Sequence, residues 1–223
     1  LQNYVLFERF LPADGLAFPK SPRPIDVQFG WKLSLCYILS SKGGLQMWDI
    51  GNFVADCRTA IDRDGTHKSV ADVVGKAMSD PAAVTSALGE PTESGIIPLY
   101  KSSDLTIVNV IWKPGMTIMP HNHEMWAVIG IYGGREDNIF WRRVKDDPEG
   151  RIEAAGARAL STGVFAPLGK DIIHSVTNPI PKLTGAIHVY GGDFFEAERS
   201  EWDPEVLTEH AYDMSKVKAM FSD

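Results

Sequence analysis

Two histidines separated by one residue, His121 and His123, are the side chains whose type and spacing most clearly suggest chemistry. They follow Gly115 and begin an apolar run that continues to Gly130. Side chains alternate between the two faces of a strand, so a strand here would point both imidazoles to the same face. Two imidazoles on one face can bind a divalent transition metal. The alternative is a pair of ordinary histidines on a solvated strand, because so short a motif is weak evidence.

Two further histidines, His174 and His188, lie in apolar segments later in the chain. Buried histidines need polar partners, and four of them on the strands of one small barrel can share a single interior. The remaining two, His67 and His210, stand in polar surroundings, and we interpret them as surface residues.

The length of 223 residues is typical of one large domain, or of one domain with an extension. A net charge of −7 argues against a nucleic-acid partner, because phosphate binding depends on Lys and Arg. No apolar run reaches the roughly 18 residues that a membrane span needs, so no membrane partner is expected. The two cysteines, Cys36 and Cys57, fit isolated thiols in a reducing, cytoplasmic compartment, with a single bridge as the alternative.

Residues 1–46 differ in amino-acid composition from the rest of the chain. Prolines break up their first half, and they end in a linker-like run of Ser, Lys and Gly. We interpret them as an upstream, non-native or flexible extension, with Met47 as the natural start. The alternative is a strand-forming arm around residues 32–39. Residues 47–223 are then expected to form a single domain.

The first part of that domain, residues 47–90, has the apolar spacing of helices. Apolar residues recur at steps of three and four from position 50 to 61, and again from position 70 to 78. A third, shorter helix is bounded by Asp80 as an N-cap and Gly89 at its end. We therefore expect a small helical lead-in, with Cys57 as a core residue.

From residue 91 the pattern changes to short apolar runs separated by Gly and Pro turns. The expected strands are residues 105–112, 121–132, 138–144, 164–167, 174–178 and 183–190, with a hairpin at 151–160 that has Gly156 near its tip. Short strands without long helices between them predict a sandwich or barrel. The core over residues 91–195 is thus expected to be all-β. The tail, residues 196–223, is expected to be helical at 204–209 and 215–221.

Two motifs in this β region resemble those of the cupin superfamily. The residues that carry them are Gly115, His121 and His123 in the first and Pro167, Gly169, His174 and Asn178 in the second. The resemblance implies a double-stranded β-helix, or jelly-roll barrel, in which the histidines of both motifs hold a metal. Most cupins add a glutamate that is separated from the second histidine by three or four intervening residues. Ala127 and Val128 occupy those positions here, and the side chain of Glu124 is expected on the opposite face.

A cupin with three histidines and no such glutamate resembles the thiol dioxygenases, which are cysteine dioxygenase and mercaptopropionate dioxygenase. The resemblance implies a mononuclear non-haem Fe(II) centre held by His121, His123 and His174. It also implies an activity, in which O2 oxidises a small organic thiol to its sulfinate.

The resemblance extends to residues beside the metal ligands. His188 and Tyr190 match a His-x-Tyr pair that the family has near its iron, and Trp112 matches a residue just before the first motif. Tyr190 would then be the active-site phenol, with His188 orienting it, and a hydroxyl there can donate to substrate. The alternative for Tyr190 is a core tyrosine near a strand end.

The chain also departs from the family. Ala186 replaces the family serine two residues before His188, and Val128 replaces the cysteine that animal cysteine dioxygenases cross-link to the tyrosine. The arginine that binds the substrate carboxylate in cysteine dioxygenase is expected before Leu105, and residues 95–101 contain none.

Other side chains are candidates for that missing role. Tyr100 and Arg142 are our candidates for substrate binding, with Lys101 and Arg143 as further ones. A lysine does not reproduce the bidentate clamp of an arginine, so the substrate need not be cysteine or any amino acid. Arg142 and Arg143 have a second interpretation, as exposed strand charges.

Two other functions stay open at this point. One is a related metal-dependent cupin oxygenase acting on a non-thiol substrate, such as a diketone. The other is a non-catalytic cupin that binds a metal and a small molecule. Imidazole ligands by themselves do not determine whether iron, nickel, copper or zinc is bound. The oligomeric state is also open.

Overall fold

The computed structural model describes residues 47–222, so the expected extension at residues 1–46 lies outside the described residues. Three helices come first, as the apolar spacing predicts. They are α1 (Ile50–Asp64), α2 (His67–Met78) and α3 (Pro81–Leu88). The caps of α3 are the expected ones, because the Asp80 side chain accepts from the Ala83 amide and Gly89 ends the helix at a positive φ of 87°.

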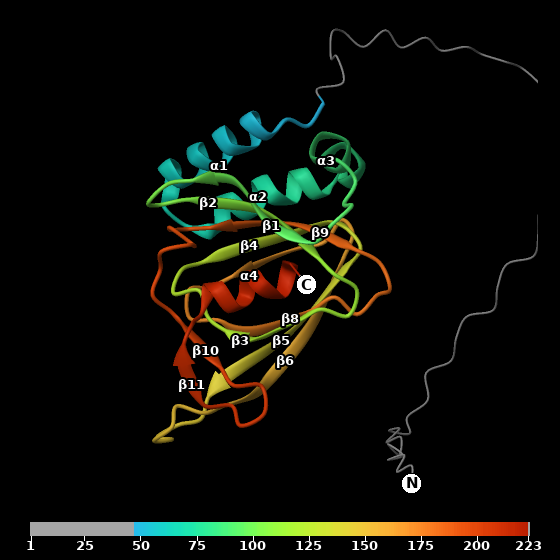
Figure 1. Ribbon diagram of the computed structural model, residues 1–223. Helices are drawn as coiled ribbons and strands as arrows, with labels where there is room; N and C mark the ends of the chain where they lie inside the picture. The colour runs from blue at the N-terminus through green and yellow to red at the C-terminus, as the bar shows by residue number, and fades with distance from the viewer. Residues whose placement is uncertain (1–46, 223) are drawn as a thin grey trace, which may run out of the picture. The chain divides into compact units, whose positions relative to one another are not determined.

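Eleven strands follow in the described part of the chain, and a last helix, α4 (Met214–Ser222), ends it (Figure 1). The strands are β1 (Gly95–Lys101), β2 (Thr106–Trp112), β3 (Thr117–His121), β4 (Ala127–Gly133), β5 (Arg135–Arg143), β6 (Ile152–Ser161), β7 (Phe165–Leu168), β8 (Ile173–Thr177), β9 (Thr184–Tyr190), β10 (Ser200–Trp202) and β11 (Glu209–Ala211).

The strands form two antiparallel sheets, with the orders β1-β2-β9-β4-β7 and β11-β10-β3-β8-β5-β6. The chain passes from one sheet to the other between β2 and β3, β3 and β4, and β4 and β5, so several neighbours within a sheet, such as β2 and β9 or β3 and β8, are distant in sequence. This is the strand order of a double-stranded β-helix, so the prediction of a cupin-like jelly-roll barrel with a helical lead-in is confirmed.

The five-stranded sheet is buried on both faces. One face, with residues such as Ile107 and Ile187, packs against α1 and α2, which cover it in Figure 1. The opposite face, with residues such as Val108 and Ile129, packs inside the barrel. Consequently β2 and β9 are buried at every position, and they lack the alternation of polar and apolar residues that marks a half-exposed strand.

A glycine lets α2 approach this sheet closely. A Cβ atom on Gly130 of β4 would lie 2.7 Å from Val74 Cγ1 and 2.9 Å from Met78 Cγ. A side chain would fit there only if Val74 and Met78 moved, so Gly130 allows the helical lead-in to pack this closely on the barrel.

Two predicted β elements are corrected. The strand predicted at residues 121–132 is two strands, because β3 ends at His121 and β4 begins at Ala127. Between them the chain turns, with Glu124 at a positive φ of 54°. The hairpin predicted at residues 151–160 is the single strand β6, and Gly156 lies opposite Phe140 at a bulge in its pairing with β5.

The ends of the barrel also differ from the prediction. Residues 95–101 form an unpredicted strand, β1, which pairs with β2. Residues 204–209 are not helical, because they lie in the turn between β10 and β11 and at the start of β11. The helix predicted at residues 215–221 is confirmed as α4. Within residues 47–222, no helix has the length and apolarity to cross a membrane.

Candidate metal centre

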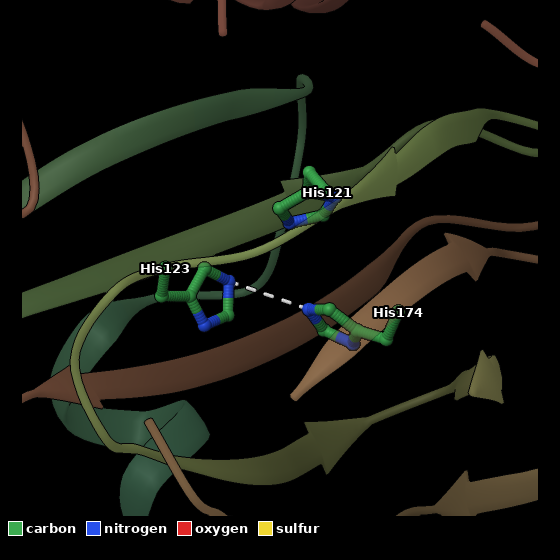
Figure 2. Close-up of side chains that lie close together, drawn as sticks. All are labelled: His121, His123 and His174. Carbon is green, nitrogen blue, oxygen red and sulfur yellow. Dashed lines mark hydrogen bonds between the residues drawn. The ribbon is translucent and has the colours of Figure 1, made fainter. Parts of the chain in front are cut away.

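Three histidines converge inside the barrel from two strands and a turn. His121 is the last residue of β3, His174 lies opposite it on β8, and His123 belongs to the turn after β3. One nitrogen from each ring can be chosen so that all three lie within 4.8 Å of one another. All three side chains are buried, and Figure 2 shows their rings facing a common point.

A turn, and not the alternation of side chains along a strand, brings His121 and His123 together. Strand alternation does not place them on one face, because His123 is not in a strand. The turn folds back beside the end of β3, and the two ring centroids lie 5.1 Å apart. The two histidines are therefore grouped as predicted, but the turn brings them together and strand alternation does not.

Hydrogen bonds fix which ring nitrogen of His121 is available. His121 Nδ1 lies 2.9 Å from the Met119 carbonyl oxygen, which can only accept a hydrogen bond. Nδ1 therefore carries the proton, and the lone pair of Nε2 faces the group. Such an outer partner orients a metal-binding imidazole.

His174 is oriented in the same way by side chains that the sequence analysis did not identify. An amide NH2 group can only donate, and Asn138 Nδ2 donates to Glu136 Oε1 over 3.0 Å. Asn138 Oδ1 then accepts from His174 Nδ1 over 2.6 Å, which leaves His174 Nε2 without a proton. Glu136 and Asn138 alternate on β5, the neighbour of β8, and that spacing of two residues was the available signal.

The three imidazoles are kept neutral. Burial lowers the pKa of His121 to about 4, and it lowers the pKa values of His123 and His174 well below the ordinary range. His123 Nε2 lies 3.3 Å from His174 Nε2, so two ring nitrogens point at each other (Figure 2). Neutral imidazoles with converging lone pairs are the ligand form that a divalent transition metal requires, so the residues fit such an ion.

A second buried chain of hydrogen bonds contains the predicted pair His188 and Tyr190. Glu136 Oε2 accepts from His188 Nε2 over 3.2 Å, so the proton of a neutral imidazole is on Nε2. His188 Nδ1 then accepts from the Tyr190 hydroxyl over 2.9 Å. Glu136 is fully buried. In this relay it is the partner of His188, a role that the resemblance to thiol dioxygenases would give to a serine at the position of Ala186.

A cavity of about 30 Å³ lies among these groups. The three histidines, Tyr190 and Trp112 line it, together with side chains of α4. A volume of roughly 30 Å³ is the share of one water molecule in the liquid. One group the size of a water molecule thus fits, whereas a substrate of several heavy atoms requires some lining side chains to move.

The residues predicted to bind substrate are not all at this cavity. Trp112 lines it, and its Nε1 is buried with no hydrogen-bond partner in the described part of the chain. Arg142 is exposed and pairs with Glu153 over 2.7 Å. Tyr100 packs with the cluster under the helices, on the other face of the five-stranded sheet. The structure therefore does not bring Arg142 or Tyr100 to the histidines.

Lys101 and Arg143, the two further candidates, are paired with carboxylates. Lys101 Nζ lies 3.3 Å from both Asp193 and Glu196. Arg143 donates to Glu209 over 2.6 Å. Both cations have partners on the barrel surface, so neither provides a free donor inside the cavity.

No family model matches the chain. A cupin-family protein of Methanocaldococcus jannaschii is 9% identical over 48% of this chain and 87% of its own, with a TM-score of 0.38. An uncharacterized double-stranded β-helix protein of Klebsiella pneumoniae is 13% identical over 56% of this chain and 89% of its own, with a TM-score of 0.35. A cupin 2 barrel protein of Leptotrichia buccalis is 16% identical over 47% of this chain and 44% of its own, with a TM-score of 0.36.

Similarities this slight carry no argument about activity, and the assignment of the fold rests on the strand order. None of the three is described as a thiol dioxygenase. That narrower expectation, like the identity of the metal, stays a prediction.

Proposed function

We propose that the protein is a mononuclear non-haem Fe(II) dioxygenase that oxidises a small organic thiol to its sulfinate. The observation that carries this proposal is one buried cavity bounded by two kinds of group. Three neutral histidines converge on it, and Tyr190, whose hydroxyl is at the end of a proton relay, lines it. A metal-storage site needs the histidines alone, so the relay favours catalysis.

Fe(II) held by His121, His123 and His174 would supply open positions for a thiolate and O2, and the electrons that activate O2. In the overall reaction the thiol sulfur is oxidised, O2 is reduced, and both oxygen atoms end in the sulfinate. The remaining steps belong to side chains of the chain itself.

The relay can remove the proton of the thiol. A thiol in the cavity can donate its proton to the Tyr190 oxygen while the Tyr190 hydroxyl proton moves to His188 Nδ1. The resulting imidazolium is stabilised by Glu136, whose Oε2 lies 3.2 Å from His188 Nε2. After this transfer the Tyr190 hydroxyl is free to donate a hydrogen bond into the cavity.

Burial raises the pKa of Tyr190 above its ordinary value. The phenol is therefore an intermediate carrier of the proton, and no phenolate needs to persist. The proton passes on to His188, whose Nε2 lies 3.2 Å from Oε2 of the buried Glu136.

Glu136 also joins the relay to the metal ligands. Through Asn138 it holds His174, and through His188 it holds Tyr190. One carboxylate on β5 thus orients a ligand and an acid–base group together, on rigid strands rather than on loops.

Oxygen uptake by protein loaded anaerobically with Fe(II) tests the proposal. Cysteine, mercaptopropionate and cysteamine are supplied in turn, and the product is analysed after reaction under ¹⁸O2. We expect one O2 consumed per sulfinate formed, with two labelled oxygen atoms in each product. A protein that holds iron and consumes no O2 with any thiol would contradict the proposal, and diketones would be tested next.

A further inference from the structure

The cavity among the histidines is closed on one side by the last helix. The buried side chains of α4, Val217 and Phe221, line it together with Val110 of one sheet and Val176 of the other. Figure 1 shows α4 lying between the two sheets. A cavity of about 30 Å³ holds one group the size of a water molecule, so a larger ligand requires an entrance.

A hollow of about 740 Å³ on the surface of the described residues borders the end of α4. Ile96 of β1 and Phe221 line both this hollow and the cavity, so these two side chains separate the two spaces. Two other surface hollows, one beside Trp48 and one beside Gly89, share no residue with the cavity. The wall at Ile96 and Phe221 is therefore where the cavity comes closest to an open hollow.

The ring of Phe221 is the aromatic part of that wall. Phe221 is 6% exposed, and its ring centroid lies 5.5 Å from that of Trp112. The Trp112 ring lies 6.1 Å from the ring of His188, and Trp112 lines the cavity but not the hollow. A ligand that passes Phe221 from the hollow therefore meets Trp112 next, and then the relay.

The two ends of α4 are held to the barrel unequally. Near its start, Lys216 Nζ donates to Glu201 Oε1 over 3.0 Å, and the Asp213 side chain accepts from the Lys216 amide over 3.1 Å. Among residues 47–222, one hydrogen bond ties the last turn to the barrel, in which the Ser94 hydroxyl donates to the Phe221 carbonyl over 2.6 Å. The ends of helices are among the regions that open most easily, so the turn that carries Phe221 can move while the start of α4 stays in place.

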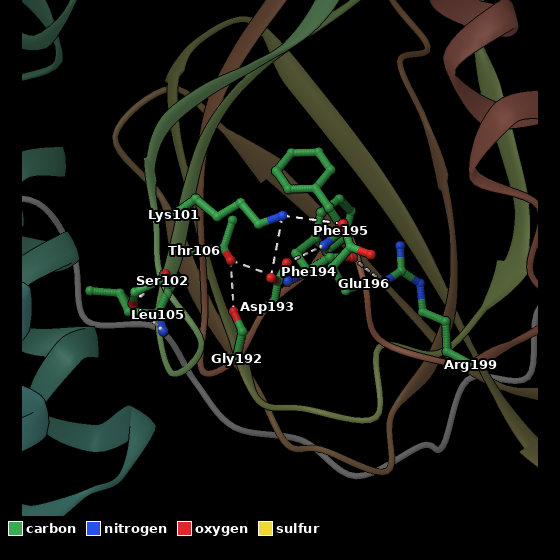
Figure 3. Close-up of polar contacts among 10 residues, drawn as sticks. All are labelled: Lys101, Ser102, Leu105, Thr106, Gly192, Asp193, Phe194, Phe195, Glu196 and Arg199. Atoms are coloured by element: carbon green, nitrogen blue, oxygen red, sulfur yellow. Dashed lines mark hydrogen bonds and ion pairs between the residues drawn. The ribbon is translucent and has the colours of Figure 1, made fainter.

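Another wall of the cavity is fixed more firmly. The hydroxyl of Thr106 on β2 donates to the Gly192 carbonyl over 2.7 Å and accepts from the Phe194 amide over 3.1 Å, as Figure 3 shows. Phe194 also stacks on Tyr190, with 4.2 Å between ring centroids. Phe194 therefore keeps its place when the cavity opens, and the wall at Phe221 is the one that yields.

We propose that Phe221 is the gate of the metal site, whose ring moves aside to admit a ligand from the hollow and closes again behind a short one. A long ligand holds the ring away from Trp112, so the packing of the two rings is lost and the site selects against length. This inference rests on the proposed function for the thiol, and it adds the entrance and the residue that limits the size of the substrate.

Equilibrium binding to protein loaded with Co(II), kept free of O2, tests the gate without turnover. A thiolate bound to Co(II) gives a sulfur-to-metal charge-transfer band, so absorbance reports binding directly. Methanethiol and 1-butanethiol differ by three methylenes, and burial of each favours binding by about fourfold, which corresponds to about 0.8 kcal/mol. Unrestricted entry would thus favour 1-butanethiol by about 60-fold. We expect the wild type to bind 1-butanethiol no more tightly than methanethiol.

Three variants complete the experiment. Phe221→Ala removes the ring, so it is expected to bind 1-butanethiol at least about 10-fold more tightly than the wild type does, with the affinity for methanethiol nearly unchanged. Ser94→Ala removes the hydrogen bond to the Phe221 carbonyl, so 1-butanethiol is expected to bind about 2- to 10-fold faster in stopped flow. Phe195→Ala is the matched control, because Phe195 lines neither the cavity nor the hollow, and it is expected to behave as the wild type does.

A wild-type protein that favours 1-butanethiol by the full factor of about 60 would overturn the gate, and this arm does not depend on any variant folding. So would a folded Phe221→Ala protein in which the dependence on chain length equals that of the wild type.

These results differ from a failure of the proposed function. Selection by length that depends on Phe221, without oxidation of any thiol by the Fe(II) protein, refutes the dioxygenase alone. Oxidation of thiols without that selection refutes the gate alone. A folded Co(II) protein in which neither thiol gives the band has no thiolate site, which overturns the proposed function and the gate with it.

Discussion

The two faces of the five-stranded sheet use the same strand for opposite purposes. On β9, Ile187 and Val189 pack outward under the helices, while His188 and Tyr190 point into the barrel. The outer face is almost wholly apolar, and its burial stabilises the fold. The inner face carries buried polar groups, each of which requires a partner.

This difference separates stability from function in the molecule. Substitutions under the helices should change the free energy of unfolding and leave the metal site intact. Substitutions around the cavity should change metal binding or turnover at a small cost in stability. The following predictions test that separation.

The largest effect is expected at the relay. Tyr190→Phe removes the hydroxyl that carries the proton to His188, so turnover should fall by about 10²- to 10⁴-fold, the range of general acid–base catalysis. Steady-state oxygen uptake measures the loss, with metal content checked in the same samples. Tyr132→Phe is the matched control, because that hydroxyl donates to Asn109 on the helical side of the sheet, over 2.8 Å. Equal losses in the two variants would remove the distinction between the faces.

The next effect is expected on the opposite face. Met78 of α2 is 2% exposed, and Met78→Ala leaves a cavity against the sheet. The free energy of unfolding should fall by about 2–5 kcal/mol, while metal stoichiometry stays unchanged. Urea denaturation measures the loss. Asp72→Ala, an exposed change on the same helix, should stay within about 0.5 kcal/mol of the wild type. Loss of metal from folded Met78→Ala protein would contradict the account.

A smaller effect is expected where the two hydrogen-bond chains meet. Asn138→Ala removes the acceptor that orients His174, so metal affinity should fall by about 10- to 100-fold. Competition with a chelator of known affinity measures it. Asn109→Ala removes a buried amide from β2 that contacts no metal ligand, and its metal affinity should equal that of the wild type. If both variants bind metal equally well, Asn138 has no orienting role.

The smallest effect concerns the chemical reactivity of the Cys57 thiol, and not the free energy of unfolding or of metal binding. Burial raises the pKa of the Cys57 thiol to about 12, so almost no thiolate is present at pH 8. In a Cys36→Ser background, the remaining thiol should resist iodoacetamide in the folded protein and react at the normal rate in urea. Mass spectrometry follows the label. Rapid labelling of the folded protein would show that the helices open readily from the sheet.

Sequence reasoning predicted the elements whose signals are local. The helices of the lead-in, the caps of α3 and the short strands follow from spacing and turn residues close in the chain. The three histidines could be grouped because their motifs resemble those of cupins. The turn at residues 122–126 could not be foreseen, since its apolar residues also fit a continuous strand.

The partners of the site were not predictable in the same way. Glu136 and Asn138 meet His188 and His174 only because β5 lies beside β8 in one sheet and faces β9 in the other. Such contacts depend on strand order, which the sequence pattern does not specify.

Metal stoichiometry is the measurement that tests the central claim most directly. Fe(II) bound per chain is determined after anaerobic loading and desalting, for the wild type and for His121→Ala, His123→Ala and His174→Ala. His210→Ala, a change outside the cavity, is the control. We predict one ion per chain in the wild type and the control, and none in the three variants. An ion retained by all three variants would contradict the account.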